Sequence, residues 1–246
     1  MNRFLSLFNY RTIIMIMVSI ISCWVAIRFN IQIHSHLMLY SLIIAFPMIF
    51  SLQAAFKRRE KALEYMSKFM AGLQSSWECF LLSKDTTTEQ KTEAKQKFTR
   101  ASDAMLDHLR NGQPMIQDVY GFINDLQGFL RHNRSDIGGR VLLKMGRYMK
   151  DVYASVAYLE SQKTHRTMAT LRALSYLTIH LFPIFQAGIL LNVFQSDNPE
   201  WLLFPVSICT SIILITLYNT QVNIEYAFDE KGLDDIKIGQ FRLKLE

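Results

Sequence analysis

The sequence predicts an all-α membrane protein in which four transmembrane helices continue into a cytoplasmic helical bundle. Three observations lead to this prediction. Hydrophobic residues make up 50% of the 246 residues and the mean hydropathy is positive, a combination that few water-soluble domains of this size reach. The apolar residues are gathered into four long stretches that hold almost no charge. The charged region between the second and third stretches has helical periodicity, and no stretch alternates for long enough to require a strand.

The four apolar stretches are the predicted transmembrane helices. A helix needs about 20 apolar residues to cross a bilayer. Leu37–Phe56, Ala173–Ser196 and Trp201–Asn223 reach this length without a Lys, Arg, Asp or Glu. Thr12–Ile27 is shorter, but Arg28 can reach the interface and the residues after it can lengthen the span. Because no small-residue cleavage site follows, a membrane helix is favoured over a cleaved signal.

The basic residues predict the orientation of these helices. Most of the 27 Lys and Arg residues lie in 57–172, whereas the loop 197–200 between the last two spans has none. Loops rich in Lys and Arg remain cytoplasmic. We therefore expect an integral membrane protein of the lipid bilayer, with both termini and the central region cytoplasmic. The expected segments are 1–56 with two spans, 57–172 with the cytoplasmic helices, 173–223 with two spans, and the tail 224–246.

The central segment is expected to contain several helices. Apolar residues recur at helical spacing over 63–81, so the second span should continue into the cytoplasm as one helix. The run SKDTTTEQ interrupts this pattern, and its hydroxyls and Asp85 suit an N-cap for the next helix. That helix should end at the C-cap signal of Gly112, and Pro114 can open a third. After HNRSDIGG a fourth helix is expected from about Val141.

No motif for catalysis, nucleotide binding or metal binding is found, so an enzyme is not predicted. No span holds the pair of carboxylates or His residues that an intramembrane enzyme would need. His34 and His36 have a ligand-like spacing but lack further ligands, and the three cysteines form no Cys-x-x-Cys pair. The basic run Lys57–Lys61 at the end of a span favours anchoring at lipid headgroups over nucleic-acid binding. We expect no metal, no cofactor and no nucleic-acid partner.

Three local patterns occur in order along the chain. The first is FPMIFSLQAAFKRREKALEY at 46–65, an apolar helix with an internal proline that runs into a Phe and a basic cluster. The second is THRTMATLRALSYL at 164–177, and the third is IEYAFDEKGLDDI at 224–236. Together they resemble the bestrophins, a family of anion channels. In that family an F-R-N-N-like stretch ends the second span, H-R-T-P precedes the third, and I-E-(N/D)-P-F with an acidic run follows the fourth.

The chain departs from the bestrophin pattern at several positions. The F-R-N-N-like stretch reads FKRR at 56–59, Met168 stands where the family has Pro, and the chain is short, with the missing length in the cytoplasmic part. In animal bestrophins the acidic run forms a calcium clasp. Here Lys231 interrupts the run, and Ca²⁺ takes about six to eight oxygen ligands. We therefore do not expect calcium gating.

The resemblance implies a homopentamer around a central pore lined by the second span, with chloride or a similar anion as the permeant. Leu42, Phe46 and Phe50 share one face of that helix and would form three apolar rings. Such a neck gates by dewetting. A second register, with Ala54 following the two Phe residues, stays open.

The same resemblance assigns roles to residues beyond the neck. Lys57, Arg58 and Lys61 would concentrate anions below it. The segment after the fourth span would wrap onto a neighbouring subunit. Its expected docking residues are Phe228, Asp234, Asp235 and Ile236.

A non-conducting protein of the same fold is the alternative. It would act as a membrane scaffold or a signalling partner through its cytoplasmic helices. The short cytoplasmic part favours this alternative, whereas a closed ring of subunits would favour a channel.

Overall fold

The structure is a computed structural model that describes residues 9–83, 85–165, 169–194, 199–229 and 235–245. The described residues form helices and contain no strand, which confirms the prediction of an all-α protein. Four helices are long and apolar enough to cross a membrane, as an integral membrane protein requires. The chain forms two compact units. The span unit holds the described residues of 1–57 and 166–225, and the bundle unit holds those of 58–165, 226–231 and 235–246.

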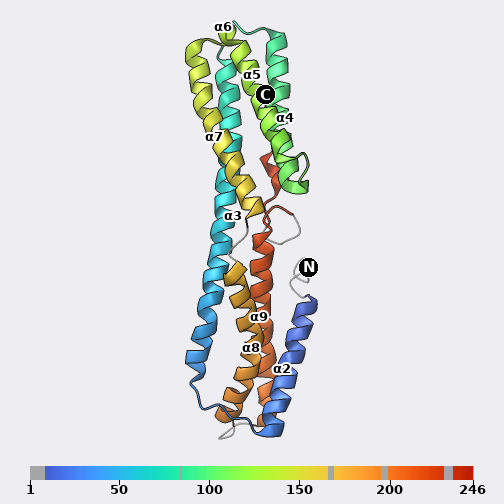
Figure 1. Ribbon diagram of the computed structural model, residues 1–246. Coiled ribbons are helices and arrows are strands. Elements are labelled where there is room, and N and C mark those ends of the chain that lie inside the picture. Colours follow the sequence, from blue (N-terminus) through green and yellow to red (C-terminus); the bar gives the residue numbers. More distant parts are fainter. Residues whose placement is uncertain (1–8, 84, 166–168, 195–198, 230–234, 246) are drawn as a thin grey trace. The chain divides into compact units, whose positions relative to one another are not determined.

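The span unit contains α2 (Tyr10–Phe29), the first part of α3 (Leu37–Leu81), α8 (Ala169–Phe194) and α9 (Leu203–Glu225), and the short turn η1 (Glu200–Leu202) precedes α9. Helices α2, α8 and α9 lie side by side (Figure 1). Their buried apolar residues form two small clusters. The larger members are Met15, Met48, Ile179, Ile215 and Tyr218 in one cluster, and Leu190, Leu191 and Leu203 in the other.

Local sequence explains where α2 ends and which membrane helices contain an internal proline. Asn30 follows α2 in the left-handed conformation, with φ 49°, and its backbone N–H donates to the carbonyl of Ile27. Asn tolerates this conformation better than most residues. Pro47 and Pro183 lie inside α3 and α8. Membrane helices accommodate proline because neighbouring groups can satisfy the freed backbone carbonyl.

The bundle unit contains the rest of α3 together with α4 (Thr88–Asn111), α5 (Ile116–His132), α6 (Arg134–Ile137) and α7 (Gly139–Thr164). The C-terminal tail adds the short turn η2 (Ile238–Phe241). One continuous apolar core joins these elements. Its fully buried members include Phe69, Leu73, Phe80, Phe98, Leu126 and Met145.

The expected helix boundaries hold with small differences. Thr87, and not Asp85, caps α4: its hydroxyl accepts the N–H of Gln90, and the Gln90 side chain accepts the N–H of Thr87. This reciprocal capping box satisfies two N–H groups, which explains why Thr87 takes the position. Gly112 ends α4 with φ 76°, as predicted, and α5 begins two residues after Pro114.

Candidate functional site

One face of α3 packs against the other helices of the span unit. Its residues are spaced every third or fourth position, as one side of a helix requires. Met48 belongs to the apolar cluster that also contains Ile179 of α8 and Ile215 of α9. The buried residues of this face are Ile44, Met48, Ser51 and Ala55.

The residues predicted to form a neck lie on the opposite, exposed face of α3. Leu42, Phe46 and Phe50 expose 48%, 49% and 56% of their surface. The rings of Phe46 and Phe50 stack, with centroids 6.1 Å apart and planes inclined by 16°. Ala54, from the second register, is partly buried. Residues that face lipid or a second subunit would be exposed in the same way, so the neck stays a prediction.

This face continues in two polar residues, of which the sequence singled out Lys57 but not Gln53. Gln53 is exposed and lies seven residues after Phe46, only about 20° from it around the helix. Lys57 is also exposed and follows Gln53 by four residues. Counting helical positions from Phe46 would have found Gln53 and would have placed Lys57 on the same face. The α3 stripe, defined as Leu42, Phe46, Phe50, Gln53 and Lys57, therefore changes along the helix from apolar to amide to ammonium.

The other two residues expected to attract anions have partners within the bundle unit. A guanidinium nitrogen of Arg58 donates to a backbone carbonyl of α7 at 2.8 Å. Lys61 Nζ lies 2.6 Å from Glu64 Oε2, and Lys68 Nζ lies 2.7 Å from Glu64 Oε1. Hydrogen bonds from Lys61 and then Lys68 lower the pKa of Glu64 to about 2. Lys61 thus shares the single carboxylate of Glu64 with Lys68, whereas Lys57 makes no ion pair with the described residues.

The predicted docking tail packs within its own bundle unit. Phe228 and Ile236 belong to the apolar core and expose 9% and 1% of their surface. The N–H of Ile236 donates to the carbonyl of Ala227 at 2.8 Å. Asp235 is partly buried, and Asp234 lies outside the described residues. Contact of this tail with a neighbouring subunit stays a prediction.

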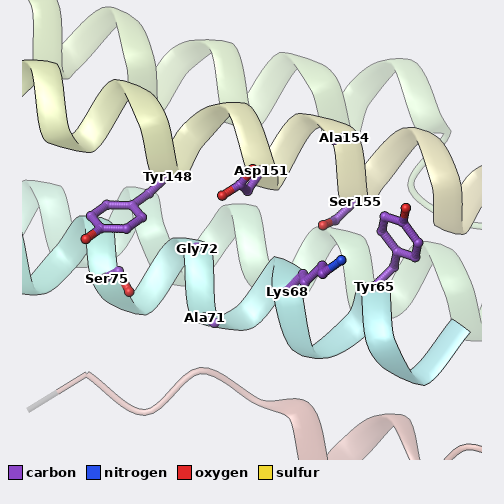
Figure 2. A pocket seen from close by; sticks show the side chains of 9 residues that line it. All are labelled: Tyr65, Lys68, Ala71, Gly72, Ser75, Tyr148, Asp151, Ala154 and Ser155. Carbon is purple, nitrogen blue, oxygen red and sulfur yellow. The ribbon is translucent and has the colours of Figure 1, made fainter. Parts of the chain in front are cut away.

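A groove of about 410 Å³ lies between α3 and α7 in the bundle unit (Figure 2). The two helices touch at Gly72, where an added Cβ would lie 2.8 Å from Val152 Cγ2 and 3.2 Å from the carbonyl oxygen of Tyr148. In Figure 2, Tyr65 and Tyr148 lie toward opposite ends of the groove, with Ser155 between them. Its lining of small and mixed polar side chains contains no arrangement suited to nucleophilic or acid–base catalysis.

No group of three or more His, Cys, Asp or Glu is placed to hold a metal ion within the part of the chain that the structure describes. His34 and His36 are both exposed. Cys23, Cys79 and Cys209 are free.

Comparison with solved structures identifies the fold. A bacterial bestrophin homologue from Klebsiella pneumoniae matches with a TM-score of 0.77, over 94% of this chain and 93% of that chain, at 13% sequence identity. This chain has the bestrophin fold. Another structure, described as a membrane protein, gives a TM-score of 0.79 over 95% of this chain and 93% of its own, also at 13% identity. No family model and no curated protein matches the sequence.

The bestrophin likeness concerns the fold, since so low an identity says little about activity. It explains why the three sequence patterns keep their order and spacing while each of them is imperfect. The match covers 93% of the Klebsiella chain, so the expected shortening of the cytoplasmic part is not evident against that chain.

Proposed function

We propose that this chain is a subunit of a bestrophin-type anion channel in which α3 lines the pore. The observation that carries the proposal is the α3 stripe, on the face turned away from the other helices of the span unit. The bestrophin fold and the four membrane-length helices support it.

The composition of the α3 stripe favours a water-filled path over a lipid surface. A polar side chain that faces hydrocarbon gives up its hydrogen bonds with water, so such residues usually face protein or an aqueous cavity. Gln53 lies within the uncharged stretch of α3, and Lys57 follows at its end. Above them, Leu42, Phe46 and Phe50 would narrow the path to an apolar neck. Such a neck conducts only while water fills it.

The same residues favour anions over cations. The edges of Phe rings carry partial positive charge, and the amide of Gln53 and the ammonium of Lys57 donate hydrogen bonds. No Asp or Glu lies in 37–56, so no carboxylate of the span would attract a cation. Chloride or an anion of similar size is the proposed permeant.

The proposed assembly is a homopentamer, as the resemblance to bestrophins implies. One subunit supplies only one pore helix, so a closed path needs several copies. Copies of a single chain close into a ring through a repeated head-to-tail interface. The exposed apolar residues Ile43 and Ile49 lie on either side of the α3 stripe and offer surface for a neighbouring subunit or for lipid.

Halide flux into liposomes that contain the purified protein tests the proposal, together with its native mass. We expect a mass of several 28.6 kDa chains and flux of chloride in excess of sodium. Lys57→Glu should lower the chloride-to-sodium permeability ratio. Lys150→Glu, which makes the same charge change on α7, is the matched control. A monomer without flux would reject the channel and leave the scaffold alternative.

A further inference from the structure

Behind the α3 stripe, five polar side chains from three helices form a continuous series of contacts. Ser51 Oγ on α3 lies 2.8 Å from Gln221 Oε1 on α9 and 3.1 Å from Ser175 Oγ on α8. Gln221 Nε2 lies 3.3 Å from Glu225 Oε1, one turn further along α9. Arg172 Nη1 on α8 lies 3.5 Å from Glu225 Oε2. These five residues are named the polar tie, and all of them belong to the span unit.

Most of the polar tie is inaccessible to solvent. Ser51 and Ser175 expose 0% of their surface, Gln221 exposes 1% and Glu225 exposes 8%. The carboxylate-bearing side chain of Glu225 is fully buried, whereas that of Arg172 is 31% exposed. A buried polar group without a partner is costly, and in a membrane no water is at hand to replace a lost one. Ser51 Oγ and Ser175 Oγ also lie 3.0 Å from the carbonyl oxygens of Met48 and Leu171 on their own helices, but the contacts of the polar tie are those that join the three helices.

The carboxylate of Glu225 sets the direction of the hydrogen bonds. A carboxylate only accepts, so Gln221 must turn its amide N–H toward Glu225 and its carbonyl oxygen toward Ser51. That oxygen also only accepts, so the Ser51 hydroxyl is the donor at 2.8 Å, in place of the longer contact of 3.0 Å with the carbonyl of Met48. The oxygen of Ser51 is then left to accept the hydrogen bond from Ser175. The ion pair on α8 and α9 thus orders a hydroxyl group on α3.

We infer that the polar tie fixes the rotation of α3 about its own axis and so holds the α3 stripe away from α8 and α9. Ser51 lies about 140° around the helix from Phe46, on the buried face. Its hydrogen bonds are directional, whereas the apolar contacts of Ile44, Met48 and Ala55 are not. Apolar packing is also a weak guide in lipid, because the lipid tails are as apolar as the side chains.

Ser51, Gln221 and Glu225 are therefore positioning residues. They do not line the proposed pore but decide which residues of α3 face it. The inference rests on the proposed function only in stating that the exposed face of α3 lines a pore. The rotation itself can be measured without any conduction.

A second buried contact in the span unit provides a matched control. Ser19 on α2 and Ser207 on α9 share a hydrogen bond of 2.8 Å, and both expose 0% of their surface. Ser19→Ala removes a buried interhelical hydroxyl, as Ser51→Ala does, but without touching α3. Any effect that is common to both changes reports general stability and not the rotation of α3.

Disulfide trapping between α3 and α9 measures the rotation, in a background in which the native cysteines are replaced by alanine. Met48 and Ile215 belong to one apolar cluster, so Met48→Cys with Ile215→Cys should give the higher yield of cross-link. Phe46→Cys with Ile215→Cys should give the lower yield, because Phe46 lies on the exposed face. Gln221→Leu should lower the cross-linking yield of the Met48–Ile215 pair about threefold and raise that of the Phe46–Ile215 pair. A factor of about three corresponds to the free energy of one typical interhelical hydrogen bond in a membrane.

Ser51→Ala should likewise lower the yield of the Met48–Ile215 pair and raise that of the Phe46–Ile215 pair. This variant keeps the proposal testable if Gln221→Leu does not fold. Ser19→Ala should leave both yields unchanged. Equal yields in all backgrounds, or an equal shift with Ser19→Ala, would overturn the inference. A shift in the yields from a protein that carries no anion flux would reject the proposed function and leave the polar tie in place.

Discussion

The span unit and the bundle unit are built in opposite ways. The bundle unit has one large apolar core, in which Phe69, Phe80 and Phe98 expose 0% of their surface. The span unit has only two small apolar clusters, while residues such as Ile13, Ile43 and Ile49 expose more than half of their surface. Its interior holds buried serines and glutamines that bond across helices.

This difference follows from the solvent that each unit needs. In water, burial of apolar surface drives folding, so the large apolar side chains belong inside. In lipid that drive is absent between helices, and small residues with interhelical hydrogen bonds specify the packing. Truncation of apolar side chains should therefore lower stability most in the bundle unit. Removal of polar side chains should report most directly on helix packing in the span unit.

The largest expected effect is that of Phe98→Ala in the bundle core. Phe98 is fully buried, with its ring centroid 5.8 Å from that of Trp77. Loss of such a side chain costs about 3–5 kcal/mol, which should be visible in thermal unfolding of the purified protein. Phe50→Ala is the control, because Phe50 is 56% exposed within one chain. An equal loss of stability in both variants would contradict the contrast between the two units.

Ile236→Ala should have the next largest effect, because it tests the tail as part of the bundle core. Ile236 exposes only 1% of its surface, and truncation of a buried Ile to Ala costs about 2–5 kcal/mol. Lys237→Ala, at the exposed neighbouring position, should be close to neutral. Deletion of 226–246 should in addition weaken the oligomer, if the tail also contacts a neighbouring subunit. Full retention of native mass would contradict that second role.

The smallest effect concerns Glu64 and pH. Its pKa is lowered from 4.5 to about 2 by Lys61 and Lys68, so the folded state favours the carboxylate. The resulting stabilisation is present above about pH 4.5 and is lost as the pH falls toward about 2. The difference in melting temperature between the wild type and Glu64→Gln should narrow over that range. Added salt should narrow it too, because the three groups are exposed.

Much of the fold could be predicted from sequence because lipid imposes a simple rule. A span must be long, apolar and helical, so the stretches around Leu37–Phe56 and Trp201–Asn223 are recognisable without any alignment. The C-cap at Gly112 was equally local. The sequence left the N-cap of α4 open between the hydroxyls of this run and Asp85, because several such groups compete over a few residues, and the structure assigns it to Thr87.

The candidate site was predictable only where it lies on one helix. Leu42, Phe46 and Phe50 follow from helical spacing, and Gln53 could have been found by the same count. The polar tie could not, because Ser51 and Gln221 are 170 positions apart and meet only through tertiary packing. A ring of subunits is still harder to predict from the sequence, since it depends on contacts between surfaces that a single chain leaves exposed.

Anion current through Phe46→Ala and Phe50→Ala in a planar bilayer tests most directly whether α3 lines a pore. Removal of one ring widens the apolar neck and lowers the barrier to wetting, so both variants should assemble normally and carry more current than the wild type. Leu52→Ala is the control, because Leu52 lies about 200° around the helix from Phe50. Unchanged current in the Phe variants, or an equal gain with Leu52→Ala, would contradict a pore lined by the α3 stripe.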